Sequence, residues 1–442
     1  MSDNVQSAKT TGNSASNGVD ISGGSVASDG ALLSVQAVVN STLTANSTMT
    51  VGAPAANSAS TLVLNSNANS ASATINTATN AMTVAAATDL ASTTVDAGPP
   101  VTQGTNAVLS GDVSDDYGAA ADYVVNNFQY VTNGSVGATA ESTISNNDGT
   151  FLLAPLATDG IQSSTVTLNG NSTLASATSN SSVNTLALSA NSSTASGGVL
   201  NQQTSGAGVT ANAAATVGVA VAGFDDAVTD SNPVNNSAAT ISGNATVARA
   251  GGNSSSNSLS AAATTFANNS EGGITSLNAD RADSVAASFA VLNEQANSGP
   301  INATATVTYG AAFNTIGSAP TVTNSALTLS GNSAASVAYG NATTNELTFA
   351  ALNSPVAPGT VPTTTAIASN QFNTGNVTAT TVATNVSFGV NSPSIVGSNG
   401  SVSQSSLSIT GNALSAAAYG NSATNTLTIS GNNVNVGTPI VP

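Results

Sequence analysis

Two acidic clusters are the parts of this sequence whose residue types could do chemistry. They consist of Asp112, Asp115, Asp116 and Asp122 in the first cluster and Asp225, Asp226 and Asp230 in the second. Paired carboxylates can hydrolyse glycosidic bonds, and carboxylate oxygens are ligands that calcium prefers. Neither segment, GDVSDDYG or FDDAVTDSN, matches an EF-hand loop or the nonapeptide of calcium β-rolls. We therefore interpret both clusters as solvated loop acids and expect no cofactor, with calcium as the alternative.

The residue types that are missing exclude most catalytic chemistry. The chain contains no histidine and no cysteine. It therefore has no imidazole base and no thiolate nucleophile. A Ser-Lys pair would have to use Lys9, close to the start of the chain. These absences predict that the protein is not an enzyme.

Composition limits the partners of this 442-residue chain. Only 5% of its residues are charged, the net charge is −17, and Lys9, Arg249 and Arg281 are the basic residues. Binding to phosphates needs many basic side chains, so nucleic acid is excluded as a partner. The sequence shows no apolar run long enough for a membrane-spanning helix. It also shows no signal-peptide pattern after Met1.

A motif of 23 residues recurs five times, with LTLSGNSAASVAYGNATTNELTF at 327–349 as one copy. Asparagine occupies three fixed positions in every copy: an anchor, the ninth residue after it and the thirteenth. These positions are Asn67, Asn76 and Asn80, then Asn171, Asn180 and Asn184, then Asn244, Asn253 and Asn257, then Asn332, Asn341 and Asn345, then Asn412, Asn421 and Asn425. We interpret them as structural repeat corners whose stacked amides form ladders.

Apolar residues follow the same register. Leu327 and Leu329 precede one anchor, Leu347 and Phe349 stand 20 residues later, and Ala338 lies between the two pairs. Residues two apart share one face of a strand, and Gly-Asn tolerates the backbone of a tight corner. The pattern predicts an all-β, elongated β-solenoid with flattened two-strand rungs of about 20 residues, in which leucine faces alanine across a narrow core.

Five glutamines mark a larger repeat: Gln36, Gln129, Gln203, Gln295 and Gln371. We therefore expect five tandem units. Their predicted ranges are 36–128, 129–202, 203–294, 295–370 and 371–442, after a leader or partial repeat over 1–35 that includes TGNSAS at 11–16.

The rungs with Gly-Asn-Ser/Ala corners resemble the curlin repeats of bacterial extracellular fibres. GNSA at 331–334 and Asn341 carry the resemblance, although asparagine stands where curlin repeats have internal glutamine. The chain length is more similar to longer curlin-related surface proteins, such as holdfast-anchoring proteins. The resemblance implies a secreted, cell-surface subunit or anchor of a fibre, biofilm or adhesive matrix that is assembled outside the cell.

Self-association end to end is expected, because a solenoid terminus is an open strand edge. Outer-membrane assembly factors and a polysaccharide matrix are further candidate partners. A monomeric polysaccharide-binding adhesin and an S-layer-type lattice protein are the alternative functions. Tyr339 and Tyr419 share one repeat position and are expected to face outward. Packing on the strand surface is the favoured interpretation for both rings, and binding to a sugar or to a neighbouring filament is the alternative.

Overall fold

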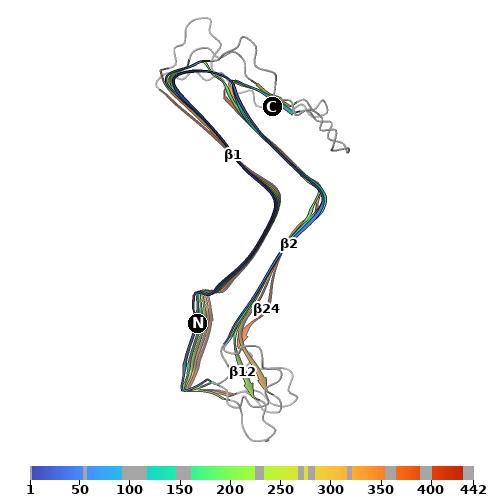
Figure 1. The fold of residues 1–442 in the computed structure, drawn as a ribbon. Coiled ribbons are helices and arrows are strands. Elements are labelled where there is room, and N and C mark those ends of the chain that lie inside the picture. The colour runs from blue at the N-terminus through green and yellow to red at the C-terminus, as the bar shows by residue number, and fades with distance from the viewer. Residues whose placement is uncertain are drawn as a thin grey trace.

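The computed structural model describes residues 2–52, 57–91, 117–145, 161–223, 233–266, 273–276, 284–315, 321–353, 365–388 and 401–431. Every element in these ranges is a β-strand, which confirms the predicted all-β class. Four sheets are parallel, and two of them consist of long strands. Figure 1 looks along the direction in which the strands stack, and the long sheets run side by side as two bent layers.

We number the sheets I to V. Long sheet I contains six strands, in spatial order β1 (Val5–Ala27), β5 (Ala68–Ala91), β10 (Ser172–Ser193), β15 (Ala245–Phe266), β22 (Ser333–Asn353) and β27 (Ala413–Gly431). Long sheet II contains β2 (Gly30–Val51), β7 (Tyr123–Ser145), β11 (Gly197–Ser205) with β12 (Gly208–Gly223), β18 (Phe289–Asn297) with β19 (Ile301–Thr315), and β23 (Thr365–Asn373) with β24 (Val377–Phe388).

Short strands connect each strand of sheet II with the next strand of sheet I. Sheet III contains β3 (Asn57–Ser58), β8 (Ile161–Gln162), β13 (Pro233–Asn235), β20 (Thr321–Thr323) and β25 (Ser401–Ser403). Sheet IV contains β4 (Thr61–Asn65), β9 (Thr165–Asn169), β14 (Ala238–Ser242), β21 (Ala326–Ser330) and β26 (Ser406–Thr410). A small antiparallel sheet V contains β6 (Tyr117–Ala120), β16 (Gly273–Ser276) and β17 (Ser284–Ala286).

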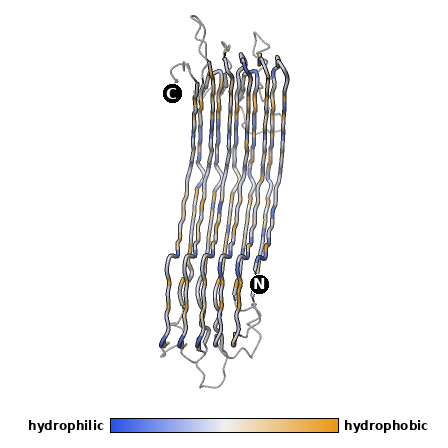
Figure 2. The backbone as a smooth tube through the Cα atoms, turned by 90° about the vertical axis from the view of Figure 1, so that its left-hand side faces the viewer, coloured by the Kyte–Doolittle hydropathy of each residue, from blue (hydrophilic) through white to orange (hydrophobic). Residues whose placement is uncertain are grey.

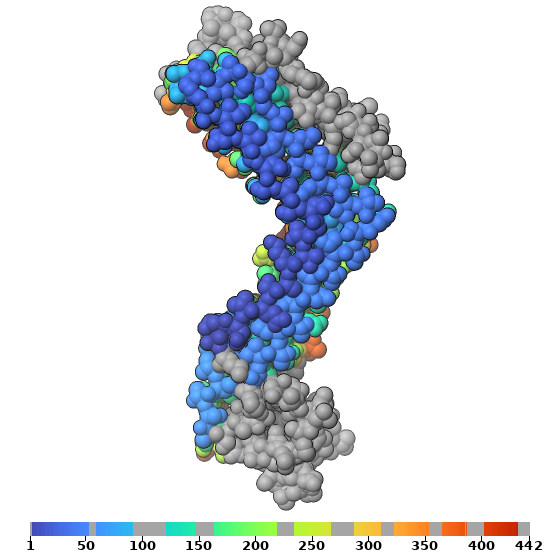
Figure 3. Space-filling view, in the orientation of Figure 1, coloured from blue at the N-terminus to red at the C-terminus, as the bar shows by residue number. Residues whose placement is uncertain are grey.

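The chain visits sheets I, II, III and IV in turn and then begins again, and the strands of sheet V are inserted between sheets I and II after β5 and after β15. We call one strand position along the stack a level. Asn67 stacks on Asn171, 104 residues later, and the anchors that follow Asn171 are 73, 88 and 80 residues apart; Asn4 stacks on Asn67 at a spacing of 63 residues. Figure 2 shows the levels side by side, and Figure 3 shows the bent outline that they produce together. The arrangement is consistent with a β-solenoid-like fold.

The predicted rung of about 20 residues is wrong. Leu64 pairs with Leu168 of the next level, and Met82 pairs with Leu186. The two apolar pairs of one motif therefore do not stack on each other. Leu64 lies in short β4, while Met82 lies far along β5, in a different apolar cluster. The division at residues 36, 129, 203, 295 and 371 stays a prediction.

The core divides into three main apolar clusters along the layers. Large side chains fill both ends, with Leu168 and Ile144 in one cluster and Leu186 and Phe289 in another. The middle cluster is rich in alanine, and Ala177 of sheet I packs there with Ala211 of sheet II. The motif alanine thus faces alanine and valine of the other long sheet, not the motif leucine, and the two layers can approach closely there.

Local backbone geometry bends the layers. In sheet I the pairing omits one residue per strand beside the ninth-position asparagines, and both Ile75 and Asn76 are buried. Two successive inward residues interrupt the alternation of a regular strand. In sheet II, Asn40 and Asn133 adopt φ values of 53° and 35°. Because the levels of sheet I carry their bend at the same place, pairing resumes in register on both sides of it.

The expected Gly-Asn corner is present between sheets IV and I. Gly170, Gly243, Gly331 and Gly411 precede the anchor asparagines and have φ between 62° and 66°. Glycine adopts this left-handed conformation without the clash of a Cβ atom.

Replacing Leu186 by alanine tests the core assignment. Leu186 is fully buried, so Leu186→Ala should lower the free energy of unfolding by about 2–5 kcal/mol through lost contacts and a cavity. Val183 lies on the same strand and is 44% exposed, so Val183→Ala should change the free energy of unfolding by less than about 0.5 kcal/mol. Urea denaturation followed by circular dichroism measures both variants. Equal losses would contradict the assigned faces of β10.

Candidate functional site

The asparagines of the motif form three continuous ladders across the stack. The anchor set lies at the corner before each long strand, while the ninth- and thirteenth-position sets lie inside the strands of sheet I. Thirteenth-position neighbours join through Nδ2–Oδ1 hydrogen bonds of 2.8 Å, as between Asn80 and Asn184 and between Asn184 and Asn257. Asn4, Asn13 and Asn17 of β1 extend the three ladders to the first level.

The hydrogen bonds of Asn180 show how one buried amide is satisfied. Its Oδ1 accepts from Asn76 at 2.9 Å, and its Nδ2 donates to Asn253 Oδ1 at 2.8 Å and to the Thr204 carbonyl at 2.9 Å. The last bond crosses from sheet I to sheet II. A buried amide without partners costs free energy, so each level must present an asparagine at the same height and position.

The five glutamines were expected only to mark the larger repeat, but they also form a ladder. Gln36, Gln129, Gln203, Gln295 and Gln371 stack through Nε2–Oε1 bonds of 2.7 Å. Their sequence spacings of 93, 74, 92 and 76 residues were the signal that could have revealed it. The bonds run in the opposite direction from those of asparagine: Gln129 donates to Gln36 of the preceding level, whereas Asn76 donates to Asn180 of the following level.

In the part of the chain that the structure describes, the ladders end at β1 and β27, the open edges of sheet I, each of which pairs with a strand on one side only. At β1, the Oδ1 atoms of Asn4, Asn13 and Asn17 accept no hydrogen bond from the described residues. At β27, Asn412 and Asn421 each donate one N–H inward, to the carbonyls of Leu329 and Gln371 at 3.1 Å. An amide nitrogen carries two N–H groups. One edge therefore presents acceptors, and the other presents donors at the equivalent places.

Most of the acidic residues singled out above lie outside the described residues: Asp112, Asp115, Asp116, Asp225, Asp226 and Asp230. Asp122 is buried, and its Oδ2 accepts from the Ser196 backbone N–H at 2.7 Å and from the Ser196 hydroxyl at 2.8 Å. In the described ranges no three His, Cys, Asp or Glu side chains gather as they would to hold a metal ion. The interpretation of Asp122 as a solvated loop acid is therefore wrong, because its carboxylate is buried and joins neighbouring levels of the stack.

Two buried tyrosines have perturbed acidity. Burial raises the pKa of Tyr309 to about 12, against a hydrogen bond with Thr246 that lowers it. Burial also raises the pKa of Tyr123. Of the two equivalent motif tyrosines, Tyr419 is 50% exposed, and the ring of Tyr339 lies over Gly251 of the adjacent strand, where a Cβ atom would clash with it.

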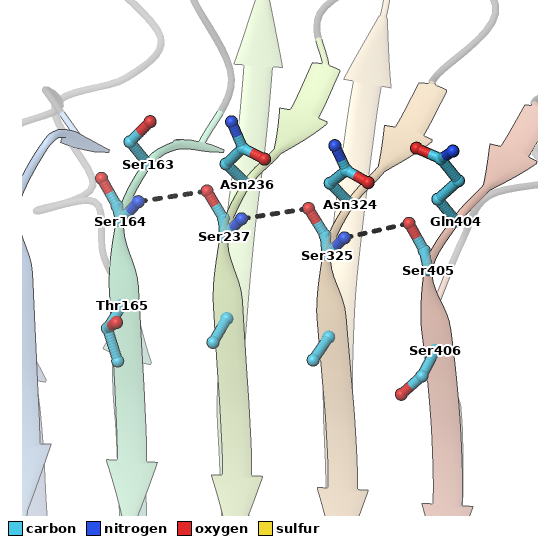
Figure 4. Close-up of a pocket in the computed structure, with 12 residues that line it drawn as sticks. Ser163, Ser164, Thr165, Asn236, Ser237, Asn324, Ser325, Gln404, Ser405 and Ser406 are labelled. Carbon is cyan, nitrogen blue, oxygen red and sulfur yellow. Dashed lines mark hydrogen bonds between the residues drawn. The ribbon is translucent and has the colours of Figure 1, made fainter.

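An uncharged groove lies at the corner between sheets III and IV. It has a volume of about 680 Å³ and crosses four levels. Its lining consists of three successive residues per level: Ser163, Ser164 and Thr165, then Asn236, Ser237 and Ala238, then Asn324, Ser325 and Ala326, then Gln404, Ser405 and Ser406. Figure 4 shows the serine of each level linked to the next by hydrogen bonds from backbone N–H to Oγ.

Comparison of the chain with protein-family models, with curated proteins and with solved structures finds no match. The described residues also contain no helix with the length and apolarity needed to cross a bilayer. The function of the amide ladders and of the corner groove must therefore be inferred from their own geometry.

Removing one amide from the middle of a ladder tests its contribution to stability. Asn180→Ala should lower the free energy of unfolding by about 3 kcal/mol, because it leaves a donor of Asn76 and the acceptor of Asn253 buried without partners. Asn212 is exposed on β12, so Asn212→Ala should change the free energy of unfolding by less than about 0.5 kcal/mol. Chemical denaturation measures both, and a neutral Asn180→Ala would show that the ladder does not stabilise the fold.

Proposed function

We propose that this chain is a structural subunit or surface anchor of a bacterial extracellular fibre or adhesive matrix, that it assembles with copies of itself, and that it has no catalytic activity. The match between its two open edges is the observation that carries the proposal. In this proposal the fold is an elongated β-solenoid built from tandem units, and the protein acts outside the cell, at its surface.

The proposed junction continues the pattern of sheet I. Asn412, Asn421 and Asn425 of one copy stand at the same mutual spacings as Asn4, Asn13 and Asn17 of the next. If β1 of one copy pairs with β27 of another in parallel, all three ladders continue in register. Donors of β27 then meet acceptors of β1, so the assembly is polar, head to tail. Five such pairings already exist inside the chain, from β1 to β27.

Apolar exposure at the last level supports the same junction. Leu414 and Leu427 of β27 occupy the inward positions that Ala334 and Leu347 hold one level earlier. Ala334 and Leu347 are buried, whereas Leu414 and Leu427 are 52% and 45% exposed. A further strand would bury these side chains, and burial of apolar area is the main favourable term in association.

The junction uses sheet I alone. Six described strands form sheet I, while sheets II, III and IV have five levels each. Pairing β27 with β1 therefore leaves one level without strands in the other three sheets. We expect the junction to be weaker than stacking within the chain and assembly to depend on protein concentration.

A pair of lysine variants tests the proposal. Leu414→Lys with Leu427→Lys places charges where the next strand must pack, so it should keep the protein monomeric. Ser415→Lys with Thr428→Lys adds the same charge to the outward face of β27 and should still form filaments. Analytical ultracentrifugation and negative-stain microscopy over a concentration series measure the outcome.

If the unmodified chain stays monomeric at every concentration, the proposed function is wrong. If the inward lysine variant forms filaments as readily as the unmodified chain, the function stands and the β27 junction is wrong.

The net charge of −17 predicts a salt effect on assembly. Copies of like charge repel one another, and the screening length falls from about 30 Å at 0.01 M salt to about 8 Å at 0.15 M. Filament growth followed by light scattering should therefore be faster at the higher salt concentration. Slower growth would show that ion pairs hold the junction together.

A further inference from the structure

The corner groove between sheets III and IV carries an array of free polar groups. The first groove residue of each level has a left-handed backbone: φ is 49° at Ser163, 48° at Asn236 and Asn324, and 51° at Gln404. A residue other than glycine rarely adopts this conformation, and glutamine is not among the residues enriched there. Three successive levels nevertheless place an amide side chain at this position.

These three amides differ from those of the interior ladders. Asn236, Asn324 and Gln404 are exposed, and their side chains have no hydrogen-bond partner in the described part of the chain. Figure 4 shows them in one row beside the serine ladder. Ser237 is fixed in that ladder, donating its backbone N–H to Ser325 at 3.1 Å and its hydroxyl to the Asn235 carbonyl at 2.7 Å. The row of free amides therefore stands on a rigid base.

The chemistry of the lining narrows the ligand class. None of the twelve lining residues is charged, so the groove offers nothing for a phosphate, a carboxylate or a metal ion to pair with. Nor does it contain a large apolar side chain on which an apolar ligand could anchor. An extended peptide gains affinity by adding to a strand edge, but the groove crosses the strands and their backbone groups are paired between levels.

A neutral polysaccharide has the complementary properties. Its hydroxyl groups both donate and accept hydrogen bonds, as amides and serine or threonine hydroxyls do. It repeats along one direction, and the groove repeats along the stack at the spacing between strands, about 4.8 Å. Successive sugar units can thus meet equivalent amides, and many weak contacts along one chain give useful affinity.

We propose that this groove binds a neutral polysaccharide chain lying along the stack, with Asn236, Asn324 and Gln404 as its main hydrogen-bonding residues. The inference goes beyond self-assembly, since it gives the subunit a second surface, away from the open edges. Through it, the protein holds a polysaccharide while β1 and β27 remain available to other copies.

The test compares two triple variants of the full chain. Asn236→Gly, Asn324→Gly and Gln404→Gly together remove the three amides, and glycine accepts the left-handed backbone at these positions. Asn46→Ala, Asn212→Ala and Asn302→Ala remove three exposed amides from the outer face of sheet II and serve as the matched control. Circular dichroism and thermal unfolding establish that both variants are folded.

Affinity electrophoresis through gels containing dextran, amylose, soluble cellulose ether or alginate measures binding. We expect at least one of the three neutral polymers to retard the unmodified chain and the control. The groove variant should bind that polymer at least about tenfold more weakly, because three hydrogen-bonding groups are lost. Retardation by none of the neutral polymers, or equal retardation of the groove variant, would overturn the proposal. Stronger retardation by the anionic alginate would show that the ligand class is wrong.

Filament formation by the groove variant separates this result from the proposed function. The groove variant should assemble like the unmodified chain, and the variant Leu414→Lys with Leu427→Lys should still bind the neutral polymer. Loss of polysaccharide binding with intact assembly supports the groove alone. Assembly of the unmodified chain without binding of any neutral polymer refutes the groove and leaves the proposed function standing.

Discussion

Registered stacking of buried amides is the constraint on which this structure depends. Asn76, Asn180 and Asn253 are buried, and their Nδ2 atoms donate both to the next amide and to a backbone carbonyl. A shift of one residue would turn these amides outward and leave the amides of the neighbouring levels without their hydrogen-bond partners. The inserts that make some passes longer must therefore lie outside the ladder positions. The levels are 63 to 104 residues apart in sequence, and the asparagines stay aligned at all of them.

The same constraint shapes the core. Because the levels repeat the pattern of inward residues, large side chains such as Leu186 and Phe289 gather in one cluster and small ones such as Ala177 and Ala211 in another. A bulky aromatic ring needs small residues in the levels on either side of it. Gly30 and Gly197 flank Tyr123 in sheet II, and a Cβ atom on Gly30 would lie 3.1 Å from that ring. Variation in residue size between levels thus follows from the fixed distance between strands.

Polarity connects the fold with its proposed role. A parallel stack cannot have identical ends, and here the asparagine ladders leave acceptors at β1 and donors at β27. The outer corners, in contrast, present groups that are not needed for stacking, such as the amides of Asn236 and Asn324. Buried amides therefore serve the stack, while exposed ones are available for a ligand.

Local sequence patterns determined the strand character, the inward and outward faces, the Gly-Asn corners and the identity of the ladder asparagines. These features depend on neighbouring residues, as at Gly331 and Asn332, and on periodic burial within one strand. The sequence did not determine which residues stack. The offset of 20 residues between Leu327 and Leu347 suggested a short rung, but Leu327 pairs with Ala239 and Leu407, one level away on either side. Only the tertiary structure decided which residues stack, because the same motif fits either a short two-strand rung or one long bent strand. Burial of sheet I against sheet II, together with pairing to levels 63 to 104 residues away in sequence, selects the long strand.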